Sequence, residues 1–281
     1  MVFGGPRPGR RMPTMSEVLM KSLSWEVAAA TDKGCVRSDN QDNFYISPDS
    51  RVFVVADGMG GEAGGALASK LAVDAVEELF WESIPNCNDD QSIQQWMVQA
   101  VSRANDNVYA VRCTNPAVRR LGTTIVVAAQ SDSGLLYIAH LGDSRAYRIS
   151  KDEISVLTQD HSVAFELLLL GKLTPEQYES SPFRSYLTRC VGHDAQVNID
   201  QSPVHVEPGD WILMCTDGLT GVVQEKEIGE TVRNAGTPEE ACKQLIEKTL
   251  AGGAPDNVTV LCAQYVEKTA DVPEKSAVEA R

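Results

Sequence analysis

The chain has 281 residues, which suits one large domain or two small ones with a substantial buried core. Its net charge of −14 argues against nucleic acid as a partner, because a phosphate backbone would be repelled. No stretch approaches the roughly 20 apolar residues of a membrane span, and the N-terminal segment lacks the apolar run of a signal peptide. We therefore expect a cytoplasmic protein with no membrane partner.

The seven cysteines are spread along the chain, and none forms a Cys-x-x-Cys pair. Their odd number and spacing favour reduced, buried thiols over disulfides or a thiolate metal site. Residues 1–22 are rich in Gly, Pro and Arg, and residues 267–281 are polar, so both are predicted to be disordered. Between them, residues 23–266 are predicted to form one continuous globular domain.

Taken in chain order, the first predicted elements are a strand over Arg51–Ala56 and helices over Glu62–Phe80 and Ser92–Cys113. In the first helix, apolar residues recur at helical spacing and form one stripe. Four strands rich in β-branched residues follow, and short turns between them indicate antiparallel neighbours. These four strands are Thr123–Gln130, Gly134–His140, Arg145–Ser150 and Ile154–Leu157.

The last predicted elements are strands over Val197–Val206 and Trp211–Thr216, a helix from about Thr237 to Leu250, and a strand over Val258–Val266. Helices therefore come in blocks between hairpins, which favours an α+β fold of antiparallel sheets covered by helices. The runs RVFVVA and WILMCT are apolar on both faces. Such strands need cover on both sides, with sheet on one side and helix on the other.

Three aspartates stand at the ends of predicted strands. Asp57-Gly58 follows the first strand, Asp217-Gly218 follows WILMCT, and Asp256-Asn257 precedes the last strand. If the last strand runs antiparallel to the other two, all three carboxylates meet at one rim of the sheet. Carboxylates packed this closely need cations to cancel their charge, and oxygen ligands suit Mg²⁺ or Mn²⁺. Each Asp-Gly alone is more often a simple turn, so the prediction depends on their convergence.

Three further residues are candidates for the same site. Arg37 offers a planar fork that can hold a phosphate, Asp42 begins an extended run, and Asp143 lies in a turn between two strands. The Gly-Asp-Ser sequence at that turn joins two strands deep in the chain, which disfavours a GDS-type esterase. The run Gly58–Ala63 fits a dinucleotide-binding fingerprint. However, Asp57 would repel a pyrophosphate, and the helix is not followed by a parallel strand that ends in an acidic residue.

These segments resemble the metal-dependent protein phosphatases of type 2C, in their bacterial form. The resemblance spans about residues 25 to 266 and follows the family's order. The matching stretches are VRSDNQDNF, VVADGMGGEAGG, LGTT, HLGDSRAYRI, LTQDHS, LTRCVG, MCTDGLT and PDNVTV. The family's fold is a four-layer α-β-β-α sandwich of two antiparallel sheets flanked by helices.

The resemblance also implies roles for the candidate residues. Asp57, Asp217 and Asp256 would form the catalytic metal cluster, Arg37 would bind the substrate phosphate, and a water activated by two Mn²⁺ or Mg²⁺ ions would hydrolyse phosphoserine or phosphothreonine. The implied metal ligands are Asp42, Asp57, the Gly58 carbonyl, Asp143, Asp217 and Asp256, with Asp143 and Asp217 sharing a weaker third ion. The implied partners are phosphorylated proteins, including Ser/Thr kinases and their substrates, and the chain is expected to be a monomer.

Two positions depart from the family pattern. Met59 stands where eukaryotic members carry a histidine that serves as general acid, and Gln41 replaces an acidic residue of some members. His161 lies in a matching motif, but a lone histidine there favours a structural role. Residues 162–185 correspond to the family's variable flap beside the active site. The alternative to an active phosphatase is a catalytically weak phosphoprotein-binding module of the same fold.

Overall fold

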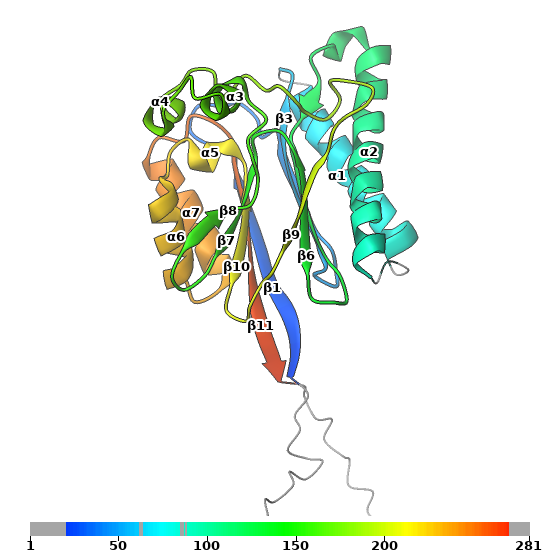
Figure 1. The fold of residues 1–281 in the computed structure, drawn as a ribbon. Helices are drawn as coiled ribbons and strands as arrows, with labels where there is room; N and C mark the ends of the chain where they lie inside the picture. The colour runs from blue at the N-terminus through cyan, green and yellow to red at the C-terminus, as the bar shows by residue number, and fades with distance from the viewer. Residues whose placement is uncertain (1–20, 62–63, 85–86, 88, 270–281) are drawn as a thin grey trace, which may run out of the picture.

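A computed structural model describes residues 21–61, 64–84, 87 and 89–269. Two antiparallel sheets pack face to face, and helices cover both outer faces (Figure 1). The predicted four-layer α-β-β-α sandwich is therefore confirmed. Within the described residues, no helix is long and apolar enough to cross a membrane.

The first sheet carries the two ends of the described chain, and its five strands all pair antiparallel. In spatial order they are β1 (Lys21–Asp32), β11 (Val258–Thr269), β10 (Trp211–Cys215), β7 (Arg145–Ile149) and β8 (Ile154–Val156). The second sheet has the order β2 (Asp42–Ile46), β3 (Val52–Met59), β5 (Ile125–Gln130), β6 (Leu136–Leu141) and β9 (Asp200–Val204). The short β4 (Gly122–Thr123) pairs with the end of β3.

Two pairs of long helices form the outer layers of the sandwich. Helices α1 (Gly65–Ser83) and α2 (Asp90–Thr114) cover the second sheet, and α6 (Glu225–Asn234) and α7 (Pro238–Ala251) cover the first (Figure 1). Local capping sets where two of them begin. The side chain of Asp89 accepts a hydrogen bond from the Ser92 amide, and Thr237 caps α7 in the same way. The shorter elements are η2 (Pro116–Val118), α3 (Val163–Leu169), α4 (Pro175–Glu179) and α5 (Asp217–Thr220).

Side chains of the central strands point alternately to the two faces of each sheet, and they contribute to three apolar cores. In β3, Val52 and Val54 face the helices α1 and α2, whereas Phe53 and Val55 face the other sheet. The strand β10 alternates in the same way between α6–α7 and the sheet interface. All five residues of β10 and the first five of β3 are buried, as their apolar runs predict.

Strand β1 and helix α6 are elements that the sequence analysis did not predict. The run Val27–Ala30 is rich in alanine, which has a weak preference for strands, so the pairing with β11 decides its structure. This pairing runs from Lys21↔Thr269 to Asp32↔Val258, and it extends slightly past the predicted domain limits at 23 and 266. The rest of the predicted disordered ends lies outside the described residues.

Candidate active site

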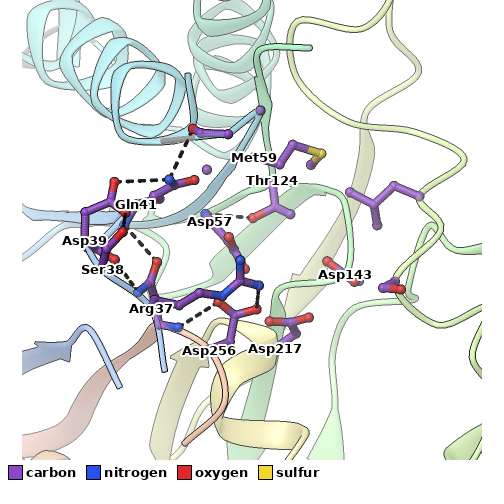
Figure 2. Close-up of a pocket in the computed structure, with 16 residues that line it drawn as sticks. Arg37, Ser38, Asp39, Gln41, Asp57, Met59, Thr124, Asp143, Asp217 and Asp256 are labelled. Atoms are coloured by element: carbon purple, nitrogen blue, oxygen red, sulfur yellow. Dashed lines mark hydrogen bonds and ion pairs between the residues drawn. The ribbon is translucent and has the colours of Figure 1, made fainter. Parts of the chain in front are cut away.

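A pocket of about 410 Å³ opens where the ends of the two sheets meet. Asp57 lies near the end of β3 in the second sheet, whereas Asp217 follows β10 and Asp256 precedes β11 in the first sheet. Their side chains lie close together around this pocket (Figure 2). The predicted convergence is thus observed, but the prediction of a single sheet rim was wrong. The carboxylates are contributed by both sheets, because β3 does not pair with β10 or β11.

Close backbone approach explains the glycine after each of two aspartates. A Cβ atom at Gly218 would lie 1.9 Å from the carbonyl oxygen of Asn257, so only glycine lets Asp217 come this near to Asp256. A Cβ atom at Gly58 would lie 2.0 Å from the carbonyl oxygen of Gly65 at the start of α1. Both positions therefore require glycine, because a Cβ atom would clash with a neighbouring backbone carbonyl.

Two consecutive threonines fix the backbone of Asp57. Its amide donates to the Thr124 hydroxyl at 3.0 Å, and its carbonyl accepts from the Thr124 amide and from the Thr123 hydroxyl, both at 2.8 Å. Thr124 is further linked to Ser144 through a 2.6 Å contact between their hydroxyl oxygens. These bonds tie the end of β3 to the turn that carries Asp143, another residue that lines the pocket.

Asp42 lies directly opposite Asp57 in the β2–β3 register, and it is not among the residues that line the pocket. Its Oδ2 accepts a hydrogen bond from the Thr216 hydroxyl at 2.9 Å. Its Oδ1 is buried and has no hydrogen-bond partner among the described residues. A buried carboxylate oxygen without a partner is costly, and a bound cation or its water would satisfy it.

Burial and mutual repulsion raise the pKa values of these carboxyl groups. Burial is the main cause for Asp57, Asp143 and Asp217, and neighbouring carboxylates add to it in each case. The same two effects, burial first, raise the pKa of Asp42 to about 7. Asp57 is central to the group, since Asp42, Asp217, Asp143 and Asp256 all raise its pKa. Divalent cations fit this set of oxygen donors, because they would cancel the repulsion and keep the groups ionised.

Arg37 lies at the mouth of the pocket and is about half exposed. Its Nη2 donates to Asp256 Oδ2 at 2.6 Å, and this hydrogen bond raises the pKa of the guanidinium (Figure 2). Met59 lines the opposite side of the pocket (Figure 2). A permanent cation thus stands beside the carboxylate cluster, where it can contact an incoming phosphate.

Asn257 and Gln41 have roles that the sequence analysis missed. The buried Asn257 amide accepts from the Gln41 amide N–H and donates to the carbonyls of Lys33 and Asp39, so it holds the loop that carries Arg37. Gln41 donates through its side chain to Asp39 Oδ2 and to the Gly61 carbonyl. Both residues lie in the stretches that resemble the family, which was the available signal.

His161 belongs to a second group that could hold a metal ion, together with the buried His140 and the partly exposed Asp200. The hydrogen bonds of this group indicate a structural brace. His161 Nδ1 accepts from the Gly142 amide, its Nε2 lies 3.1 Å from Asp200 Oδ2, and Arg189 donates to both oxygens of Asp200. The two imidazole rings are stacked, with centroids 4.6 Å apart. The structural role expected for His161 agrees with these contacts, and the carboxylate pocket remains the candidate metal centre.

The segment predicted as a flap also borders the pocket. It contains two short helices, α3 and α4. Ser185, the last residue of the predicted segment, lines the pocket, and so does Leu187. The part of the chain that borders the pocket here therefore extends slightly beyond the predicted limit at 185. A buried ion pair fastens α4 to the first sheet, since Tyr178 and Arg145 both bond to Asp160.

Together, the double antiparallel sandwich and its oxygen-lined pocket define a protein of the metal-dependent phosphatase class. The chain belongs to the protein phosphatase 2C family, because the sequence model of that family matches residues 33–254.

Relatives and solved structures agree with this assignment. The chain is 32% identical over 237 residues to the serine/threonine phosphatase stp of Listeria innocua, which covers 83% of this chain and 93% of that protein. It is similar to the crystal structure of the Mycobacterium tuberculosis serine/threonine phosphatase PstP/Ppp, with a TM-score of 0.78 and 32% identity, over 86% of this chain and 99% of that one. A PstP catalytic domain in complex with two manganese ions aligns with a TM-score of 0.76 and 30% identity, over 87% and 100%.

Proposed function

We propose that this protein is a serine/threonine phosphatase that hydrolyses phosphoserine and phosphothreonine in proteins with two Mn²⁺ or Mg²⁺ ions. The observation that carries the proposal is the cluster of half-buried carboxylates beside the exposed Arg37 fork. One oxygen of Asp42 in this cluster is buried and has no hydrogen-bond partner among the described residues. Relatives named as serine/threonine phosphatases, and the PstP domain with two manganese ions, support the same function.

Each candidate ligand has a proposed role that its position supports. Asp57 would help to hold both cations, because the other four carboxylates of the cluster all lie near enough to raise its pKa, and the Gly58 carbonyl would add a ligand. The remaining proposed ligands are Asp42, Asp143, Asp217 and Asp256. Asp143 and Asp217 would share a weaker third ion, as the family resemblance implies, and the two carboxylates are close enough for Asp217 to raise the pKa of Asp143.

The bound cations would supply an activated water and neutralise charge on the phosphoryl group. The chain's own residues would do the positioning. Arg37 would hold the phosphate at the pocket mouth, where its guanidinium offers a planar fork. Met59 lines the pocket but cannot donate a proton, so it would not serve as the general acid for the leaving oxygen.

The test is Mn²⁺-dependent hydrolysis of p-nitrophenyl phosphate and of a phosphothreonine peptide, with and without a chelator. We expect the wild type to turn over both substrates and the chelator to abolish this activity. The Asp217→Ala variant should stay folded but show no turnover. Asp132→Ala serves as the matched control, because it removes an exposed carboxylate outside the pocket and should keep full activity. Phosphopeptide binding without turnover in the wild type would instead favour the catalytically weak binding module.

Arg37→Ala separates phosphate binding from chemistry. We expect it to raise KM more than it lowers kcat, because Arg37 contacts the substrate phosphate in the ground state as well as in the transition state. A loss confined to kcat would assign Arg37 to the transition state alone.

The proposed setting is cytoplasmic, with Ser/Thr kinases and their substrates as partners and a monomeric enzyme. The phosphatase relatives support phosphoproteins as substrates. Phosphoproteomics of a deletion strain would identify the substrates, since their phosphorylation should rise when the enzyme is lost. Light scattering on the eluting protein should give a mass near 30.5 kDa. A stable dimer would contradict the monomer.

A further inference from the structure

A short turn between α2 and β4 carries two adjacent arginines and packs against the pocket residue Gly60. We call residues 115–121 the arginine turn. Arg119 and Arg120 are both exposed, and neither forms an ion pair with a carboxylate of the described chain. Most arginines of the described residues, such as Arg103, Arg145 and Arg148, are paired with acidic side chains. In a protein of net charge −14, two neighbouring free guanidinium groups form a distinct local surface.

The arginine turn lies directly against the pocket lining. A Cβ atom at Gly60 would lie 2.8 Å from the Arg120 carbonyl oxygen, and Gly60 lines the pocket. The next residues continue into β4, where Gly122 pairs with Met59. The arginine turn therefore lies next to Gly60 and Met59, which both line the pocket.

The backbone of the arginine turn is held firmly. Its first residue, Asn115, accepts a hydrogen bond from the Ala117 amide, and Val118 and Leu121 are buried in the core under α2. Arg112 donates to the Arg119 carbonyl at 3.0 Å and also to the carbonyls of the 192–193 loop. Since the backbone is fixed, contact with a ligand would order the two side chains but would not have to order the turn itself.

Local charge makes a cationic surface useful at this point. The pocket is lined by five aspartates and one arginine, so its own field repels acidic groups. Cations bound in the pocket would offset the charge at the phosphate, but not along the flanking peptide. Exposed guanidinium groups on the turn beside the pocket would favour acidic side chains in the flanking peptide, and such rim charges act mainly on specificity and on association rate.

We propose that Arg119 and Arg120 form a specificity site for acidic side chains that flank the phosphorylated residue of a substrate protein. This inference rests on the proposed phosphatase function and extends it to the class of substrate. Arg112 acts as a positioning residue, because it holds the backbone that presents the two arginines.

The test compares two phosphothreonine peptides that differ only at the two residues on each side, which are glutamate in one and glutamine in the other. We expect wild-type kcat/KM to be about tenfold higher for the glutamate peptide, which corresponds to about 1.4 kcal/mol. Arg119→Gln with Arg120→Gln should remove this preference through a higher KM for the glutamate peptide. Hydrolysis of the glutamine peptide and of p-nitrophenyl phosphate should change less than about twofold.

Matched variants separate the site from net charge. Lys226→Gln with Lys243→Gln removes the same charge from exposed positions on α6 and α7, and it should keep the preference. Arg119→Lys with Arg120→Lys keeps the charge and should retain most of the preference. Charge reversal to glutamate at both positions should favour the glutamine peptide, and added salt should shrink every difference.

Two outcomes would overturn the inference. One is equal kcat/KM for the two peptides in the wild type, and the other is an equal loss on both peptides in the double glutamine variant. The proposed function fails separately, if the wild type shows no Mn²⁺-dependent hydrolysis of p-nitrophenyl phosphate. In that case, anisotropy of the two fluorescein-labelled peptides still decides whether Arg119 and Arg120 select acidic flanks.

Discussion

Gly218→Ala is expected to disrupt the carboxylate cluster without removing any carboxylate. The added methyl carbon would lie 1.9 Å from the Asn257 carbonyl oxygen, whereas ordinary van der Waals contact begins near 3.4 Å. The first turn of α5 and the start of β11 must therefore separate by about 1.5 Å. This shift would move Asp217 away from Asp256. A misplacement of about 1 Å can cost about 100-fold in rate, so we expect a loss of at least that size in kcat/KM.

The assay is Mn²⁺-dependent hydrolysis of p-nitrophenyl phosphate, together with a thermal shift measured over a Mn²⁺ titration. The variant should need more Mn²⁺ for half-maximal activity and show a smaller Mn²⁺-induced rise in Tm. Gly221→Ala is the matched control, because Gly221 follows the same helix with a φ of −73° and its added Cβ would lie 3.1 Å from the Asp217 carbonyl. We expect it to lose less than about threefold. Wild-type kcat/KM in a folded Gly218→Ala variant would refute the close-approach argument.

Three further predictions concern charge in the fold. Asp57→Asn should raise the Tm of the metal-free protein, because it removes the central repelling carboxylate, and it should abolish the Mn²⁺-induced shift; a lower metal-free Tm would contradict this. Asp160→Ala should cost about 3–5 kcal/mol in urea unfolding, since it leaves the buried Arg145 guanidinium without its carboxylate, and a cost below about 1 kcal/mol would refute the role of this pair. Asp200→Asn should destabilise the protein at neutral pH. Arg189 holds the pKa of Asp200 at about 2, so the difference from wild type should close as the pH falls from 3.8 toward 2, and a constant difference would count against it.

Much of the fold could be predicted because its central strands are locally distinctive. The runs that became β3 and β10 are continuously apolar, and their burial between a sheet and a helix layer follows from that pattern. Strand β1 was missed because Val27–Ala30 has little local preference for a strand. Its structure depends on pairing with β11, whose residues lie at the other end of the chain.

The site was predictable in its residue types and less so in its arrangement. Asp57, Asp217 and Asp256 stand next to strand ends, and this position alone indicated convergence. Their assignment to one sheet was wrong, because strand runs do not specify which partners they pair with. The bonds of Thr216 to Asp42 and of Asn257 to Gln41 join residues that are 174 and 216 positions apart. No local pattern encodes such bonds.

The sequence by itself determined the chemical inventory of this protein. It specified the oxygen ligands, the glycines that permit close approach, the Arg37 fork, and the absence of an ionisable group at Met59. Only the tertiary structure decided that the carboxylates meet between two sheets, and that one oxygen of Asp42 has no hydrogen-bond partner among the described residues. It also decided that the turn with Arg119 and Arg120 packs against the pocket residue Gly60. The physical reason is the sequence distance over which each property is determined. Side-chain chemistry and strand preference depend on neighbouring residues, whereas burial, charge repulsion and strand register arise from segments that meet only in the folded chain.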